Sequence, residues 1–171
     1  TFAWRTLPES PFVFIGNRDE FHQRPAAPAH WWDNPAGILA GRDLQADGTW
    51  LGLNRKGRFA GGTHFREVGS EPANRSRGEL VTRFPAGTDS DAHWNAPHEQ
   101  ADDYAGFNLI FYDGDSLGYF SNRGMHRRSL EPGLYALSNN FLDTPWPKVT
   151  RLKQALTDQL QCRWNDEAML E

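Results

Sequence analysis

Four polar residues that could do chemistry follow directly on an apolar stretch near the start of the chain. Residues 11–16 read PFVFIG and predict a buried strand, and Asn17, Arg18, Asp19 and Glu20 come immediately after it. An amide, a cation and two carboxylates at one strand end perturb one another's pKa values, as groups in functional sites often do. The alternative is a structural role, in which Asn17 and Asp19 would end the strand by bonding their own backbone and Arg18 would pair with a carboxylate such as Glu79.

Two further positions carry side chains suited to holding a small molecule. Trp31 and Trp32 lie in a proline-rich segment, where they could wall a ligand pocket or be buried against a sheet, the more frequent fate of such rings. Arg123 could bind a substrate carboxylate through two parallel hydrogen bonds, with an exposed ion pair as the commoner outcome. We assign Asn17, Glu20, Trp32 and Arg123 to substrate binding.

The residue types that bind metals or phosphates are not arranged for either task. The six histidines, at positions 22, 30, 64, 93, 98 and 126, lack metal-ligand spacing, so we expect no metal site. The sequence has no glycine-rich phosphate loop and no serine-centred nucleophile elbow, and it indicates no cofactor. The single cysteine, Cys162, forms no intramolecular disulfide, which favours a reducing, cytoplasmic location.

Length, composition and charge narrow the class of protein. A chain of 171 residues with 38% hydrophobic content predicts one domain over residues 1–171. The net charge of -4 comes from interspersed charges, which argues against nucleic acid or anionic lipid as partners. No apolar run approaches the roughly 20 residues that a membrane helix needs, so we expect no membrane span. A small molecule is the expected partner, and the oligomeric state is open.

The hydrophobic pattern predicts an α+β fold with mainly antiparallel sheets. After the first strand, the prolines of residues 18–36 predict a loop. Strands near 38–41, 49–54 and 58–64 form a meander, residues 107–123 form a hairpin, and GLYALSNN forms a last strand. A capping-box spacing at Ser76 begins a helix that ends near Pro85, a weaker helical pattern covers 89–104, and a final helix runs from Thr144 to about Cys162.

Eight motifs in order along the chain resemble those of the NRDE protein family, which includes the transport-and-Golgi-organisation proteins. They are Asn17-Arg18-Asp19-Glu20-Phe21 with Arg24-Pro25, Gly41-Arg42-Asp43, Gly48-Thr49-Trp50-Leu51-Gly52, Gly57-Arg58-Phe59-Ala60, Ser76-Arg77-Gly78-Glu79-Leu80, Gly106-Phe107-Asn108-Leu109, Ser121-Asn122-Arg123, and Leu137-Ser138-Asn139 with Asp143-Thr144-Pro145-Trp146.

The resemblance implies the fold of N-terminal-nucleophile hydrolases, a layered αββα sandwich of antiparallel sheets. In that fold the first residue of the mature chain is nucleophile and base at once. Members of the family begin Met-Cys, so Thr1 would follow the nucleophilic cysteine by about three residues, and further strands would follow the last helix. We therefore expect both ends to be truncated, with Thr1 as a processed nucleophile as the alternative.

The resemblance also implies roles for three residues. Arg18 would lower the pKa of the cysteine thiol, and Asp19 would orient the α-amino group, as in cysteine-type amidases of this fold. Asn139 would donate its side-chain amide to an oxyanion hole, unless Asn139 and Asn140 only shape the turn into the last helix.

Two functions follow from the resemblance. The first is an enzyme, an amidohydrolase that cleaves a C–N amide bond in a small acylated substrate. The second is a non-enzymatic protein that binds or carries haem or another small ligand in the same pocket, with His22, His30 or His64 as a haem ligand. A free N-terminal cysteine would favour the first function, and a haem Soret band the second.

Overall fold

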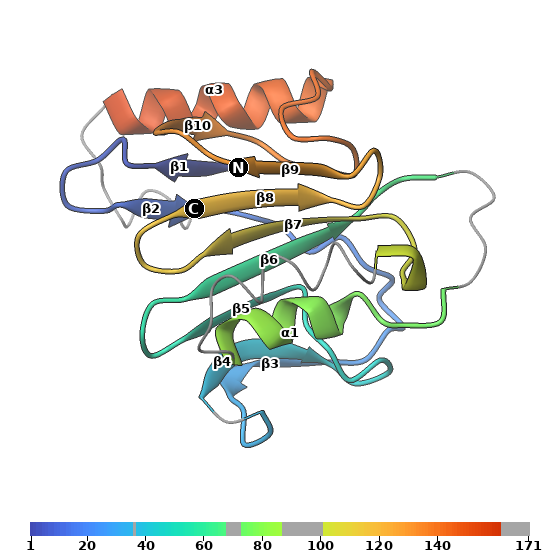
Figure 1. Cartoon of the computed structure of the whole chain (residues 1–171). Coiled ribbons are helices and arrows are strands. Elements are labelled where there is room, and N and C mark those ends of the chain that lie inside the picture. Colours follow the sequence, from blue (N-terminus) through green and yellow to red (C-terminus); the bar gives the residue numbers. More distant parts are fainter. Residues whose placement is uncertain (36, 68–72, 87–100, 162–171) are drawn as a thin grey trace. The chain divides into compact units, whose positions relative to one another are not determined.

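The computed structural model describes residues 1–35, 37–67, 73–86 and 101–161 (Figure 1). The chain forms two compact units. Unit 1 joins Thr1–Asn17 to Glu131–Glu171, and unit 2 is the continuous segment Arg18–Leu130 between them. The prediction of a single domain over residues 1–171 stays a prediction.

Unit 1 contains a three-stranded antiparallel sheet and one helix. Strand β1 (Phe2–Trp4) lies in the middle, between β10 (Gly133–Tyr135) and β2 (Phe12–Phe14). Phe2 is fully buried, and its ring packs on three aromatic neighbours from the two flanking strands, Phe12, Phe14 and Tyr135. Helix α3 (Pro147–Gln161) contacts β10 and buries Val149 and Leu156, which are seven residues apart on one face.

Unit 2 contains a seven-stranded antiparallel sheet in which the strands follow chain order from β3 to β9. One long insertion, between β6 and β7, carries α1 and the short 3₁₀ helix η1. The elements are β3 (Ala26–Trp31), β4 (Ile38–Asp43), β5 (Leu51–Asn54), β6 (Phe59–His64), α1 (Gly78–Ala86), η1 (Ala101–Asp103), β7 (Phe107–Tyr112), β8 (Leu117–Ser121) and β9 (His126–Ser129).

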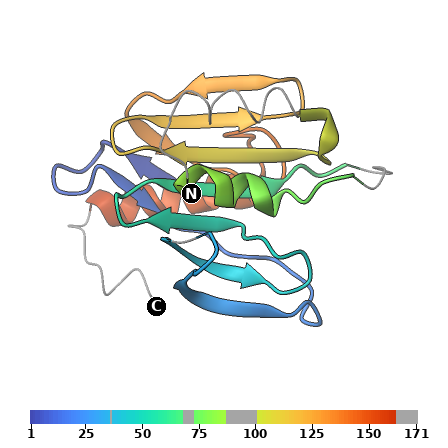
Figure 2. The same cartoon turned by 60° about the horizontal axis from the view of Figure 1, so that its bottom comes forward.

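The core of unit 2 lies between α1 and the sheet. Helix α1 crosses β5 and β6, as Figure 2 shows, and presents an apolar stripe to the sheet. The buried side chains are Leu80, Val81 and Phe84 of the helix with Ala60, Phe107, Leu109, Phe111 and Phe120 of the strands and Tyr104 of the insertion.

The start of α1 depends on two glycines and a serine. The Ser76 hydroxyl accepts a hydrogen bond from the Gly78 amide at 3.3 Å, as an N-terminal cap does. A Cβ on Gly78 would lie 2.9 Å from the Cα of Gly48, so the two backbones touch where neither residue has a side chain. The carboxylate of Glu79, in the first turn, contacts Tyr104 and Arg75.

The α+β prediction with antiparallel sheets is confirmed, as are the meander and the hairpin. Among the described residues, α1 packs on the seven-stranded sheet and α3 contacts the three-stranded sheet. A helix layer on a sheet is one half of an αββα sandwich. Each described helix is too short or too polar to cross a membrane.

The predicted loop over residues 18–36 is wrong, because β3 occupies Ala26–Trp31. Pro28 is tolerated there because β3 is an edge strand and its register shifts between Ala27 and His30, so no ladder bond is lost.

Three other elements also differ from expectation. The last predicted strand is limited to β10, and α3 begins at Pro147 rather than at Thr144. Strand β9 was not predicted, because its HRRS sequence is polar and exposed along its whole length. Residues 87–100, which hold most of the predicted weak helix, and Cys162 lie outside the described residues.

Candidate functional site

The N-terminal end of β1 is flanked on both sides by predicted site motifs. Because β2 and β10 both run antiparallel to β1, each ends where β1 begins. The Ile15 amide donates to the Thr1 carbonyl at 2.9 Å, so the ladder with the β2 side extends beyond β1 itself. Strand β2 then leads into Asn17, and β10 leads into Ser138 and Asn139.

Thr1 takes part in the backbone ladder of this sheet. Its hydroxyl donates to the carbonyl of Tyr135 at 2.9 Å, and its amino group donates to the carbonyl of Ile15 at 2.8 Å. The amino-group contact is that of an ordinary strand residue, and the hydroxyl is engaged with a neighbouring strand, which favours a structural interpretation over a role as nucleophile.

Asn139 lies on the loop between β10 and α3, and its amide oxygen is occupied. The Ser138 hydroxyl and the Lys148 ammonium each donate to that oxygen, at 3.3 Å. Two donors from the same unit thus hold the Asn139 amide oxygen.

The boundary between the units falls inside the predicted catalytic run. Asn17 is the last residue of this part of unit 1, whereas Arg18, Asp19 and Glu20 belong to unit 2. Asn17 and Asp19 are exposed and form no hydrogen bond or ion pair with other described residues. The catalytic candidates Arg18 and Asp19 are thus in one unit, and Asn139 is in the other.

In unit 2, the charged residues Arg18 and Glu20 belong to a network that reaches Asp43 at the end of β4. Arg18 lies 3.7 Å from the Glu20 carboxylate, and its guanidinium stacks on the Trp50 ring at 4.5 Å. Glu20 is 3.8 Å from Arg24, which bonds Asp43 through two nitrogens at 2.8 and 2.7 Å. The partner of Arg18 is therefore Glu20 and not Glu79, which faces other arginines.

Asp43 joins this network to the turn after β4. Besides Arg24, its carboxylate accepts hydrogen bonds from the amides of Gln45 and Ala46. Burial alone would raise the pKa of Asp43, but these three donors outweigh it and hold the pKa below its usual value. The carboxylate is consequently ionised over the whole neutral range and ties the Arg24 loop to β4.

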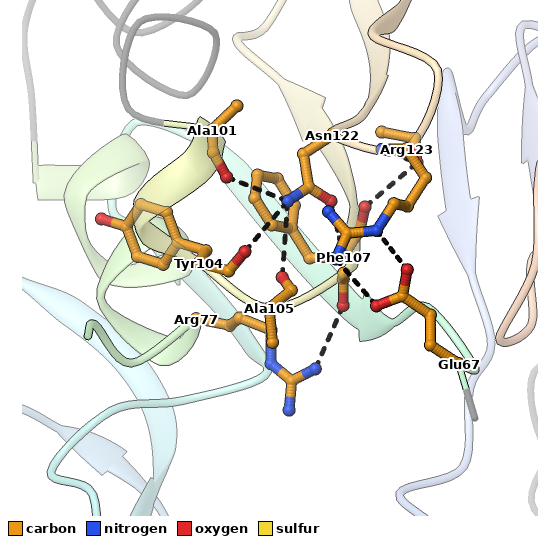
Figure 3. A network of polar contacts seen from close by, with 10 residues as sticks. Glu67, Arg77, Ala101, Tyr104, Ala105, Phe107, Asn122 and Arg123 are labelled. Atoms are coloured by element: carbon orange, nitrogen blue, oxygen red, sulfur yellow. Dashed lines mark hydrogen bonds and ion pairs between the residues drawn. The ribbon is translucent and has the colours of Figure 1, made fainter. Parts of the chain in front are cut away.

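A second charged group contains Glu67, Arg77 and Arg123, which come from three segments of the chain (Figure 3). Glu67 pairs with Arg123 through both carboxylate oxygens, and that bond, helped by the Gly106 amide, lowers the pKa of Glu67. Arg77 donates to the Gly106 carbonyl at 3.1 Å. A Cβ on Gly106 would lie 2.8 Å from the Glu67 carboxylate, so glycine permits this approach.

Arg123 therefore forms the ion pair that was its alternative interpretation. Two nitrogens of the Arg123 guanidinium bond the Glu67 carboxylate. A substrate carboxylate would therefore have to displace Glu67. Arg77 keeps an exposed edge, but protein atoms crowd its guanidinium, and this desolvation together with the charge of Arg24 lowers its pKa. An arginine remains a cation even so.

The Asn122 side chain ties the end of the β6–β7 insertion to the sheet. Its side-chain oxygen accepts the Phe107 amide at 2.8 Å, and its nitrogen faces the carbonyls of Ala101, Tyr104 and Ala105 at 3.1 to 3.4 Å (Figure 3). One buried amide thus joins η1 to the first residue of β7. Sequence reasoning placed this residue only within a motif, because nothing local shows that its partners lie up to 21 residues away.

Trp32 is buried rather than lining an open surface. Its side chain is 3% exposed, its indole N–H donates to the Ala40 carbonyl at 3.0 Å, and Arg42 stacks on the ring at 4.5 Å. These contacts favour its structural interpretation. Among the described residues, no group of three or more His, Cys, Asp or Glu side chains is placed to hold a metal ion.

Comparison with known proteins agrees with the motif pattern. A family model described as Transport and Golgi organisation 2 matches residues 1–171. The Transport and Golgi organization 2 homolog of Mus musculus is 37% identical over 159 residues, which cover 87% of this chain and 58% of the mouse protein. The human homolog is also 37% identical and the Bos taurus homolog 36%, with the same coverage.

The chain thus spans 58% of the length of these curated relatives. The family inferred from the eight motifs is confirmed by a match over all of residues 1–171. The chain is a member of the Transport and Golgi organisation 2 family.

Proposed function

We propose that the chain is the core of an amidohydrolase of the N-terminal-nucleophile type, which cleaves a C–N amide bond in a small acylated substrate. The nucleophile in this proposal is the cysteine that the family resemblance implies upstream of Thr1.

The observation that supports the proposal is the topology of the unit 1 sheet. In the observed register Phe2 faces Phe14 on one side and Tyr135 on the other. A segment that continued β1 upstream of Thr1 would therefore run beside Gly16 and Asn17 on the β2 side. On the β10 side the chain continues into Ser138 and Asn139. A residue about three positions before Thr1 would have polar motifs on both flanks.

The chemistry follows from those neighbours. The α-amino group takes the thiol proton, the thiolate attacks the amide carbonyl carbon, and the proton passes to the amine that leaves. Water then hydrolyses the thioester, which releases the acid and restores the thiol. Asn139 would donate its amide N–H to the oxyanion in both steps, and removal of such a donor typically costs 10²–10³-fold in kcat.

Arg18 and Asp19 would act on the nucleophile itself. A guanidinium near the cysteine favours the thiolate and lowers the thiol pKa. Asp19 is exposed and forms no hydrogen bond or ion pair with other described residues, so its carboxylate is available to orient an α-amino group. Arg18 is held by Glu20 and Trp50, which would fix its charge in one place.

The test uses the full-length protein and a panel of N-acyl p-nitroanilides of increasing chain length. We expect one probe to be hydrolysed, iodoacetamide to alkylate the N-terminal cysteine rapidly at pH 7, and Arg18→Ala to slow that alkylation.

Asn139→Asp removes the donor but keeps the amide oxygen's position, and we expect a loss of about 100-fold or more in kcat. Asn140→Asp is the matched control, because it keeps the oxygen that accepts the Phe141 amide at 2.7 Å. Slow alkylation with no turnover of any probe would refute the proposal, as would full activity in Arg18→Ala.

The second candidate is haem or small-ligand binding, and the geometry of His30 favours it. His30 Nδ1 lies 2.8 Å from the Pro28 carbonyl, which can only accept, so Nδ1 is the donor in this contact and Nε2 is the ring nitrogen left for a ligand. The exposed ring stacks near Trp32, and Arg42 and Arg55 lie on the two adjacent indoles, where they could pair with propionates.

Titration with haemin tests this candidate. A Soret shift that is lost in His30→Ala and kept in His22→Ala would support axial ligation by His30. An unchanged spectrum, or equal behaviour of the two variants, would refute it.

A further inference from the structure

We propose that Arg77 is the recognition residue of a site for a small ligand that carries one carboxylate. The site differs from the one that the sequence suggested at Arg123, because Glu67 occupies Arg123. The inference concerns ligand binding alone, so it stands or falls without amide hydrolysis.

The Arg77 side chain is held at both of its ends. Arg77 directly precedes α1, and its carbonyl accepts the Leu80 amide of the first turn at 3.1 Å. At the other end, Nη1 donates to the Gly106 carbonyl at 3.1 Å, and the same carbonyl accepts the Phe65 amide at 2.8 Å. A guanidinium that is already held in place loses little conformational freedom when a ligand binds it.

That hydrogen bond leaves most of the Arg77 donors for a ligand. A guanidinium has five N–H groups in a planar fork, which matches a carboxylate through two parallel bonds. Among the described residues, Arg77 bonds only the Gly106 carbonyl. In Figure 3 its other terminal nitrogen points away from Glu67 and Arg123. Because the residue is exposed, a ligand can reach this edge of the guanidinium.

Arg77 differs from the neighbouring arginines, each of which faces a carboxylate. The pairs are Arg18 with Glu20, Arg24 with Asp43, and Arg123 with Glu67. Crowding by protein atoms and the charge of Arg24 both lower the pKa of Arg77. A crowded cation with no bonded carboxylate is unfavourable, and a ligand carboxylate would supply the missing partner.

Two acidic residues limit the charge of the ligand. Glu20 and Glu67 lie close enough for their charges to act on Arg77, although neither bonds it. At that range each also repels an incoming anion, and the repulsion doubles for a dianion such as sulfate. One guanidinium fork with two carboxylates nearby therefore suits a monocarboxylate.

Binding can be measured by NMR titration of the full-length protein with sodium butanoate, 2-pentanone and sodium sulfate at constant ionic strength. The ketone 2-pentanone has nearly the shape of butanoate but no charge. The reporter is the backbone amide of Phe107, which shares a peptide group with the carbonyl that Arg77 bonds. We expect a saturable shift with butanoate, at a Kd on the order of 1 mM, and binding of the other two ligands that is at least about 10-fold weaker.

Three variants test whether Arg77 forms the site. Arg77→Gln removes the charge and the fork, and we expect it to weaken butanoate binding by about 10-fold or more. Arg77→Lys keeps the charge but not the two-point geometry, so an intermediate loss should follow. Arg66→Gln is the matched control, at an exposed position in the same unit that forms no hydrogen bond or ion pair with other described residues. It removes the same charge and should change the Kd by less than about twofold.

Three results would overturn the proposal. The first is an equal response to butanoate and 2-pentanone, or tighter binding of sulfate than of butanoate. The second is unchanged butanoate binding in Arg77→Gln. The third is an equal loss in Arg66→Gln, because the effect would then come from surface charge in general. If Arg77→Gln does not fold, Arg77→Lys and the comparison of the three ligands decide the question.

Discussion

Replacement of Asn122 by aspartate should make the stability of the protein depend strongly on pH. Asn122 is 7% exposed, and its amide is placed to bond the Phe107 amide and three carbonyl groups. Asn122→Asp has almost the same shape. It keeps the oxygen that accepts the Phe107 N–H, but it puts a second oxygen where the NH₂ group faced the carbonyls of Ala101, Tyr104 and Ala105.

The size of the effect follows from the change in charge. A buried carboxylate beside three carbonyl oxygens is disfavoured both by desolvation and by repulsion, and such environments raise a carboxyl pKa by about 3 units. Each unit corresponds to 1.36 kcal/mol, so the ionised form would destabilise the fold by about 4 kcal/mol. A carboxyl whose pKa is raised in the folded state loses stability as the pH rises. The destabilisation should therefore be near 1 kcal/mol at pH 4, from lost donors, and near 5 kcal/mol at pH 7.

Urea unfolding at pH 4 and pH 7 measures this difference. The matched control is Asn74→Asp, an exposed position in the same unit, which should stay within about 0.5 kcal/mol of the unmodified protein at both pH values. Equal destabilisation of Asn122→Asp at the two pH values, or less than 1 kcal/mol at pH 7, would refute the network described around Asn122.

Three further outcomes are expected in the same unfolding assay. Gly78→Ala should destabilise by about 1–3 kcal/mol, because its Cβ would lie 2.9 Å from the Gly48 Cα and 3.0 Å from the Thr49 nitrogen, and an unchanged midpoint would contradict that contact. Asp43→Asn should cost about 0.5–1 kcal/mol at pH 7. Since the pKa of Asp43 is lowered, its stabilisation exists above the unfolded carboxyl value and disappears as the pH falls, so a deficit that persists at pH 2 would argue against the bond to Arg24. Trp32→Phe should cost about 1–2 kcal/mol through the lost indole N–H bond to β4, and a neutral result would place that ring outside the core.

The sequence was informative wherever structure depends on local pattern. Alternating apolar residues and a DGD turn predicted the β7–β8 hairpin, and Ser76 marked the start of α1 two residues before it begins. Both signals act within a few residues, so no knowledge of distant partners is needed.

The sequence failed where a residue's environment depends on distant strands. Pro28 predicted a loop because proline cannot donate to a ladder, yet it lies in β3, whose outer side has no neighbouring strand in the sheet order. Whether a strand is at the edge or in the middle of a sheet is set by the order of all the strands together.

The same division applies to the candidate site. The order of the motifs over residues 1–171 was enough to predict the family, and the motifs also pointed to the polar residues after β2 and to the Asn139 segment after β10. The folded chain was needed to show that Arg18 pairs with Glu20, that Glu67 pairs with Arg123, and that Lys148 faces Asn139. The physical reason is that a charged side chain selects among all the partners within a few ångströms, and folding brings those partners together from distant parts of the chain.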